Sequence, residues 1–79
     1  MRYVYILESL SHPGLHYTGM TDDLRIRLQK HNAGGSRHTS KYRPWRIETY
    51  IGFSNAQKAI LFERHLKSAS GRAFAKKRL

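Results

Sequence analysis

Apolar and polar positions alternate along three stretches of the chain, and this period of two predicts three β-strands. Residues 2–8 carry apolar side chains on both alternating faces, so we expect a central strand that is covered on both sides. Residues 15–19 return as its antiparallel partner after a turn at 11–14, which contains proline and glycine. Residues 45–53 alternate apolar with polar side chains, which predicts a third strand with one buried face and one largely wet face.

A stretch with helical periodicity follows the second strand. It begins after a tight turn at Gly19, with Thr21 or Asp22 as the expected N-cap, and it ends at the glycines 34–35. At about 100° per residue, one face of this helix carries Leu24, Arg27, Leu28 and His31. An arginine and a histidine therefore lie on or beside the stripe that should face the core, where a purely structural helix would place apolar residues.

A second helical stretch runs from an N-cap at Ser54 or Asn55 to about Lys67, and Glu63 lies near the centre of its apolar arc. A carboxylate on a core-facing stripe must be paired, protonated or bound to a metal, because leaving it charged and alone costs on the order of several kcal/mol. Two alternatives stay open. One is an internal ion pair with Arg27 or another cation, and the other is a site for Mg²⁺, which keeps several waters and needs few protein carboxylates.

The end of the chain is basic. We expect Ser70-Gly71 to break the second helix and residues 72–79 to form a short amphipathic tail that closes one face of the sheet through Phe74. The cations of this tail are typical of a solvated face, although they add affinity for a polyanion.

Composition then narrows the function. The 79 residues have room for a single domain, 1–79, with one modest core. Fifteen Lys and Arg against five Asp and Glu give a net charge of +10, which favours an anionic partner, most often nucleic acid. The sequence has no cysteine for disulfides or thiolate zinc sites, and its five histidines lack the paired spacing of a metal site. No segment approaches the roughly 18 apolar residues that span a bilayer, so we expect no membrane contact and a cytoplasmic protein.

Six residues singled out by separate arguments occur in a familiar order: Tyr5, Tyr17, Gly19, Arg27, His31 and Glu63. Together they resemble the GIY-YIG nuclease superfamily, in its small single-domain branch, over essentially the whole chain. The first motif of that superfamily appears here as Tyr3-Val4-Tyr5 and the second as Tyr17-Thr18-Gly19. The departures from the motif, at Tyr3, Val4 and Thr18, lie in expected strands where a similar shape can serve.

The resemblance implies an α/β (α+β) fold in which helices flank a three-stranded antiparallel sheet, in the order strand, strand, helix, strand, helix, helix. It also implies hydrolysis of a phosphodiester bond with one divalent metal, Mg²⁺ or Mn²⁺, held by Glu63. In that scheme Arg27 stabilises charge on the phosphate. Tyr5 or Tyr17 orients or deprotonates the attacking water, which requires a nearby cation to lower the pKa of the phenol, and His31 relays a proton.

The segment 36–44 has no periodicity and contains residues that can grip a nucleic-acid backbone: Arg37, His38, Lys41, Tyr42 and Arg43. It could also be a plain solvated connection, but the overall charge favours phosphate contacts, and Tyr42 could stack on an unpaired base. No recognition helix or zinc finger is evident. We therefore expect DNA as the partner, single-stranded or branched rather than duplex, with little sequence preference and a role in DNA repair, recombination or processing.

Two other functions stay open at this point. The chain could be a non-catalytic nucleic-acid-binding module in which Arg27 pairs with Glu63, or a nuclease subunit that is active only with a partner protein. A homo-oligomer could also supply specificity that a chain of this size lacks.

Overall fold

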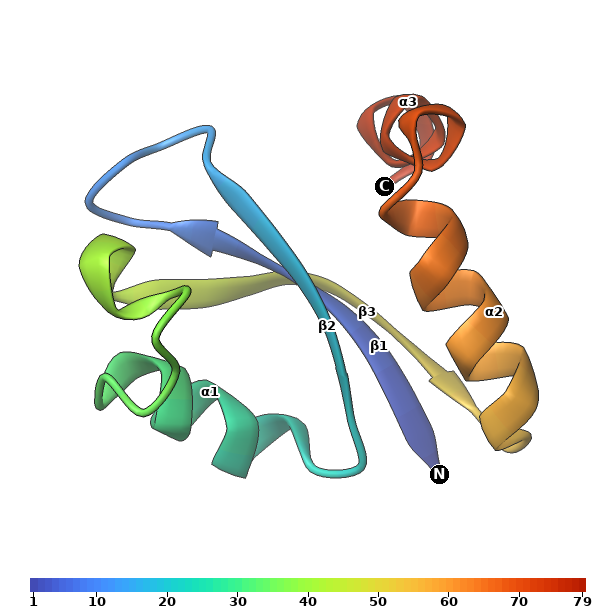
Figure 1. Ribbon diagram of the computed structural model, residues 1–79, viewed down its shortest axis with the longest axis horizontal. Coiled ribbons are helices and arrows are strands. Elements are labelled where there is room, and N and C mark those ends of the chain that lie inside the picture. Colours follow the sequence, from blue (N-terminus) through green and yellow to red (C-terminus); the bar gives the residue numbers. More distant parts are fainter.

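The computed structural model describes residues 1–79 and contains one three-stranded antiparallel sheet. The strands are β1 (Arg2–Ser9), β2 (His16–Thr21) and β3 (Trp45–Phe53), and their order in the sheet is β2-β1-β3. The first predicted strand is therefore central, as its two apolar faces indicated. The three strands cross the middle of the molecule in Figure 1.

Helices cover both faces of this sheet. Helix α1 (Leu24–Asn32) lies on one side and α2 (Ala56–Leu66) on the other, with α3 (Ala69–Arg78) following at the far end of α2 (Figure 1). A short 3-10 turn, Ser40–Tyr42, lies between α1 and β3. The predicted fold class and element order are confirmed, and no helix is long and apolar enough to cross a bilayer.

The cap of α1 differs from the prediction. Asp23, rather than Thr21 or Asp22, is the N-cap, and its side chain accepts a hydrogen bond from the backbone N–H of Ile26 at 3.0 Å. Thr21 instead accepts from the N–H of Asp23 and so fixes the residue that caps the helix. At the other end Gly34 adopts φ +82°, a conformation that favours glycine, and this terminates α1 where the sequence predicted.

The junction of α2 and α3 also corrects an expectation. Helix α2 begins at the predicted cap Asn55 and ends at Leu66. Ser68 then caps α3 by accepting from the N–H of Gly71, so Gly71 lies inside α3 and does not break a helix. A Cβ on Gly71 would collide with the backbone carbonyl of His65. The glycine therefore lets the first turn of α3 pack directly on the last turn of α2.

Two small hydrophobic clusters lie on opposite faces of the sheet. The Tyr5 face packs against α1 and contains Tyr5, Leu7 and Trp45, while the Val4 face packs against α2 and contains Val4 and Ile6. Ala75 of α3 joins the cluster on the Val4 face, whereas Phe74 is 39 % exposed. The prediction that Phe74 closes a sheet face is therefore wrong.

A β-bulge makes β3 contribute to both faces. Ile6 pairs with Thr49, but the next residue of β1, Leu7, pairs with Ile47, so β3 has one extra residue at this point. An extra residue reverses which face the following side chains point to. Ile47 therefore packs on the Tyr5 face and Phe53 on the Val4 face. The prediction of one buried and one wet face for this strand is wrong, although its burial does alternate residue by residue.

Candidate active site

A chain of buried hydrogen bonds joins β1, α1 and the segment before β3 on the Tyr5 face. The hydroxyl of Tyr5 lies 2.9 Å from Nε2 of His31, and Nδ1 of His31 lies 2.8 Å from Oγ1 of Thr39. All three residues are at least 97 % buried. Every buried side-chain nitrogen and oxygen of the chain has a hydrogen-bond partner, so this polar network is fully satisfied.

Gly19 is what allows Tyr5 to reach this position. The two residues are directly opposite each other in the β1–β2 pair, and a Cβ on Gly19 would overlap the phenol ring of Tyr5 near its hydroxyl. Tyr17 lies two residues earlier on β2 and on the same face, with its ring edge-on to His31 at 5.3 Å. Both tyrosines therefore border His31 on this face of the sheet.

The environment shifts two pKa values in opposite directions. Burial raises the pKa of Tyr5 from 10.0 to about 12, with Tyr17 and Glu63 adding to the rise and Arg27 opposing it. Burial also lowers the pKa of His31 below its ordinary value of 6.5, and the positive charges of Arg27 and Lys30 lower it further. At neutral pH the pair is therefore a neutral phenol and a neutral imidazole. Arg27 does lower the pKa of Tyr5, but burial raises it by more. The expectation of a net lowering is therefore wrong for Tyr5.

Arg27 is half-buried and has no acidic partner. Its side chain lies against Tyr5 and the apolar residues of α1 and β3 that form this side of the core: Leu7, Leu24, Leu28 and Ile47. It takes part in no ion pair, so the anticipated pair between Arg27 and Glu63 does not form. A guanidinium held at this edge without a counterion is available to an anionic group of a ligand.

Glu63 comes from the opposite side of the sheet. It is on α2, and its carboxylate pairs with Lys67 one turn later at 3.1 Å. Its side chain is 20 % exposed, so it lies at the border of the core rather than within it. It is nevertheless close enough to raise the pKa of Tyr5, which places the two groups in one electrostatic environment. A single carboxylate open to water fits a divalent ion that retains most of its own water ligands.

The segment before β3 has two kinds of residue. Arg37, His38, Lys41 and Arg43 are exposed, as backbone-gripping residues must be. Tyr42 is half-buried, packs against the cluster on the Tyr5 face, and meets the ring of His12 edge-on at 5.0 Å. Its ring is therefore engaged within the protein rather than held out as a platform for a base.

Sequence reasoning missed Thr39, which is fully buried and holds His31 in place. The carbonyl of Thr39 also accepts from the indole N–H of Trp45 at 2.9 Å. A threonine within a polar, aperiodic segment carries no sign of burial. The one signal in the sequence was its position between His38 and Lys41, which were expected to contact DNA, and this signal indicated an exposed residue.

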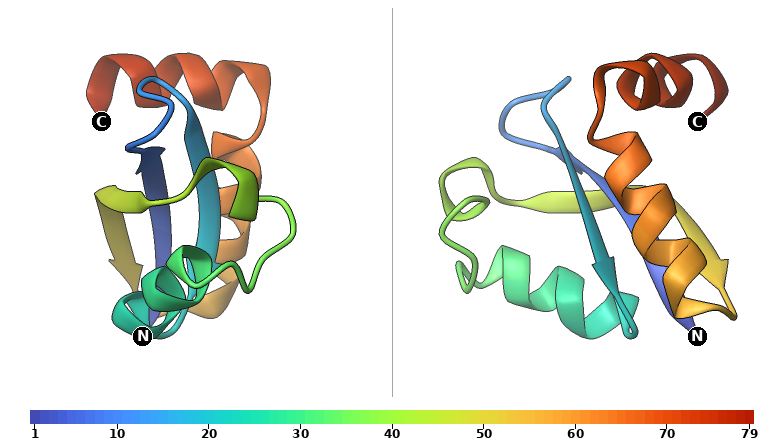
Figure 2. Two further views of the ribbon diagram at one scale, coloured as in Figure 1. Left: turned by 90° about the vertical axis from the view of Figure 1, so that its left-hand side faces the viewer. Right: turned by 45° about the vertical axis from the view of Figure 1, so that its right-hand side comes forward.

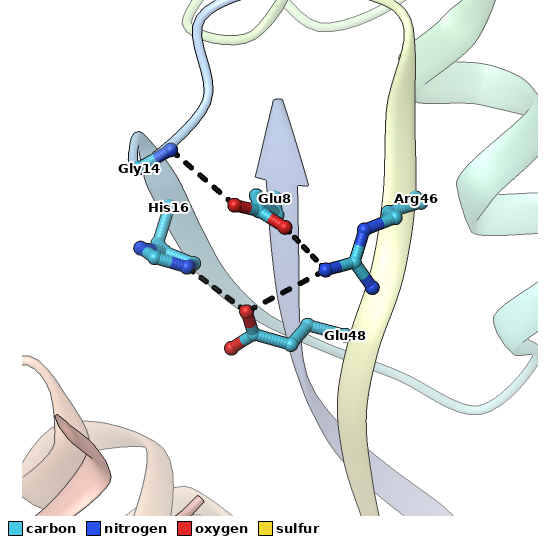
Figure 3. A network of polar contacts seen from close by, with 5 residues as sticks. All are labelled: Glu8, Gly14, His16, Arg46 and Glu48. Atoms are coloured by element: carbon cyan, nitrogen blue, oxygen red, sulfur yellow. Dashed lines mark hydrogen bonds and ion pairs between the residues drawn. The ribbon is translucent and has the colours of Figure 1, made fainter. Parts of the chain in front are cut away.

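Sequence reasoning also missed a charged cluster on the Val4 face, drawn in Figure 3. Glu8, His16 and Glu48 come from the three strands, and their ligand atoms lie within 4.8 Å of one another, so they could hold a metal ion. Arg46 pairs with both carboxylates, and Nε2 of His16 lies 3.1 Å from Glu48. The N–H of Gly14 and the guanidinium of Arg46 hold the pKa of Glu8 below its ordinary value of 4.5. Adjacent strands brought these residues together, which sequence spacing could not reveal.

Comparisons with known proteins find a family model and several relatives that are similar to this chain. A family model described as the GIY-YIG catalytic domain matches residues 1–78. A protein named structure-specific endonuclease subunit SLX1 homolog, from Giardia intestinalis, is 40 % identical over 65 residues, which are 77 % of this chain and 18 % of the relative. The SLX1 protein of Mycosarcoma maydis is 40 % identical over 76 residues, 80 % of this chain and 12 % of the relative. A UPF0213 protein of Cupriavidus pinatubonensis is 37 % identical over 79 residues, 95 % of this chain and 86 % of its own length.

Proposed function

This chain belongs to the GIY-YIG catalytic domain family, and on that premise we propose that it is a metal-dependent endonuclease that hydrolyses phosphodiester bonds in DNA. The observation that carries the proposal is the buried hydrogen bond between Tyr5 and His31. The unpaired guanidinium of Arg27 and the carboxylate of Glu63 are both close enough to act on the pKa of Tyr5. A phenol, an imidazole, a guanidinium and a carboxylate together provide a proton path, a phosphate ligand and a metal ligand.

Proton transfer is assigned to Tyr5 and His31. The hydroxyl of Thr39 donates to the carbonyl of Ser36 at 3.5 Å, which leaves its oxygen to accept from Nδ1–H of His31. Nε2 of His31 is then free to accept the phenolic proton of Tyr5. With a pKa of about 12, Tyr5 is not a phenolate at neutral pH, so it acts as a relay. Its oxygen takes a proton from the attacking water as its own proton passes to His31, and Tyr17 beside it orients that water.

Arg27 and Glu63 are assigned to the phosphate. The planar guanidinium of Arg27 donates to the phosphate oxygens as negative charge develops there. Glu63 would hold Mg²⁺, or Mn²⁺ in its place, and such an ion would supply positive charge to the phosphate and the leaving oxygen. In the free protein the carboxylate of Glu63 is paired with Lys67 at 3.1 Å.

The substrate we propose is single-stranded or branched DNA, cut with little sequence preference during repair, recombination or processing in the cytoplasm. The names of the SLX1 relatives support a structure-specific activity and action as one subunit of an assembly. This chain spans less than a fifth of those two relatives, so a partner protein or a second copy is part of the proposal. The exposed cations Arg37, His38, Lys41 and Arg43 would contact the DNA backbone.

The test is a nicking assay with purified protein on branched, single-stranded and duplex DNA, each with Mg²⁺ and with excess chelator. We expect cleavage of the branched and single-stranded substrates that the chelator abolishes and Tyr5→Phe reduces sharply. Tight binding without cleavage under any metal would contradict the proposal. It would favour the second candidate, a nucleic-acid-binding module on the same fold, which the net charge of +10 by itself also supports.

A further inference from the structure

The largest hollow of the molecule is not at Tyr5 but on the Val4 face, between α3 and β2. It has a volume of about 770 Å³, and its floor is formed by the apolar residues Ile6, Leu66 and Ala75. Figure 2 shows α3 lying level with the hairpin that joins β1 and β2, and that hairpin forms the rim of the groove through Gly14 and Leu15. Its lining also includes Tyr17, and His16 and Glu48 of the exposed charged cluster. No function assigned above uses the groove as a binding site.

One wall of the groove is basic. It carries Lys67 at the end of α2 together with Arg72 and Lys76 of α3. Arg72 and Lys76 have no acidic partner, and their spacing of four residues puts two like charges side by side on one helix face, where they repel each other. A polyanion bound beside these two residues would reduce that repulsion.

Two packing features hold this wall in place. Gly71 lets α3 contact the backbone of His65, and Ala75 packs into the cluster on the Val4 face. Arg72 and Lys76 flank Ala75 in the sequence, and both are exposed and line the groove. The packing of Gly71 and Ala75 therefore positions the helix that carries the two basic residues.

The groove also connects with the active site. Lys67 lines the groove and pairs with Glu63 at 3.1 Å, so Lys67 links the groove to the proposed metal ligand. A volume of about 770 Å³ is within the range of about 300–1,000 Å³ that is usual for sites of single small ligands. A nucleotide or a short single strand fits such a space, and a duplex does not.

From these observations we propose that the groove between α3 and β2 binds the sugar-phosphate backbone of a single nucleic-acid strand, adjacent to the phosphate that is cut. Only the position next to the phosphate that is cut rests on the proposed nuclease function, since strand binding can be measured without cleavage. Arg72 and Lys76 contact phosphates of the strand, and Lys67 joins this contact to the catalytic carboxylate.

The test compares two double variants of the same helix that remove the same charge. Arg72→Gln with Lys76→Gln alters the groove, and Lys77→Gln with Arg78→Gln alters cations of α3 outside it. Binding of labelled oligothymidylate and oligouridylate is measured against salt concentration, in chelator so that nothing is cut. Each lost phosphate contact on a single strand should reduce the log–log slope by about 0.7, so we expect a fall of about 1.4 for the groove variant and much less for its control.

Equal losses for the two double variants would overturn the proposal, because the effect would then be one of net charge alone. Competition by thymidine monophosphate as strong as by the strand would overturn it too, in favour of a site for free nucleotides. Absence of cleavage by the wild-type protein, with the slopes as expected, would contradict the nuclease function and leave the strand site standing.

Discussion

The two faces of the sheet each hold a histidine within a polar cluster, and the two clusters differ in almost every physical property. On the Tyr5 face, His31 is 2 % exposed and its neighbours in the network are uncharged hydroxyls. On the Val4 face, His16 is exposed and its neighbours are two carboxylates and an arginine. The Tyr5 network joins β1, α1 and the segment before β3, whereas the exposed cluster draws on all three strands. Both would be noticed in a search for titratable groups.

The difference shows what prepares a site for chemistry. Burial shifts the pKa values of Tyr5 and His31 away from each other, so a proton is held on the phenol next to a neutral acceptor. In the exposed cluster Arg46 pairs with both carboxylates, and the surrounding water screens these charges. By the proximity of ligand atoms alone, Glu8, His16 and Glu48 (the Glu8 cluster) would be the more obvious metal site. By the shifts in pKa, Tyr5 and His31 are the better candidates for proton transfer.

Replacing each histidine by alanine should give the largest difference in stability between the two clusters. His31→Ala leaves the hydroxyls of Tyr5 and Thr39 buried without partners and opens a cavity, which should cost about 2–5 kcal/mol of unfolding free energy. His16→Ala removes one exposed contact and should cost no more than about 1 kcal/mol. Urea denaturation of both variants measures the difference. Similar losses for the two would show that the buried network has no special weight.

Gly19→Ala tests how closely the Tyr5 face is packed. The new methyl group would overlap the phenol ring of Tyr5, and relief by movement of the strand or the ring should cost about 1–3 kcal/mol. Gly52→Ala is the matched control, since its neighbours are the movable side chains of Met1 and Tyr3 at the exposed end of β3. It should change stability by no more than about 0.5 kcal/mol. A tolerated Gly19→Ala with unchanged melting temperature would contradict the packing described here.

The two clusters should respond to acid in different pH ranges. The pKa of His31 is lowered in the folded protein, so the unfolded chain binds more protons, and stability should begin to fall as pH drops below about 6.5. The pKa of Glu8 is also lowered, but from 4.5, so its contribution is lost only at lower pH. Urea denaturation between neutral pH and pH 5 measures how the free energy of unfolding depends on pH. This dependence should become weaker in His31→Gln and should remain as in the wild type in Glu8→Gln. The opposite pattern would assign the acid response to the exposed cluster.

The smallest effect should come from Arg46→Ala. It breaks two exposed ion pairs, whose stabilisation is modest and is screened by salt. The loss of stability should be smaller than that of Gly19→Ala and should disappear when thermal melts are repeated in high salt. A large loss that is independent of salt would mean that the exposed cluster is as important to folding as the buried one.

The sequence was sufficient for the elements and for much of the site. Periodicity located all three strands and the helices α1 and α2. The placement of Arg27 and His31 on the inner stripe of α1 identified two groups that the structure does bring to Tyr5. These predictions succeeded because a side chain's position on a helix or strand is fixed by local geometry.

The errors have a common cause in contacts between distant segments. The bulge in β3 depends on how β1 pairs with it, and the burial of Thr39 depends on His31 and Trp45. Gly71 was expected to break a helix because glycine has a low helix propensity. In the structure it lies within α3, where the absence of a side chain lets the backbone of α2 pack closely against it. The pKa of Tyr5 was misjudged for the same reason, since Arg27 was foreseeable and the degree of burial was not.

The central claim is that catalysis belongs to the Tyr5 face with Glu63 and not to the Glu8 cluster. The most direct measurement is the rate of Mg²⁺-dependent cleavage of a branched DNA by Glu63→Gln and by Glu8→Gln, two isosteric changes that each remove one carboxylate charge. We predict a loss of at least about 10²-fold for Glu63→Gln, as is typical when a group that stabilises developing charge is removed, and a wild-type rate for Glu8→Gln. A wild-type rate for Glu63→Gln with a large loss for Glu8→Gln would contradict the claim and place the metal at Glu8, His16 and Glu48.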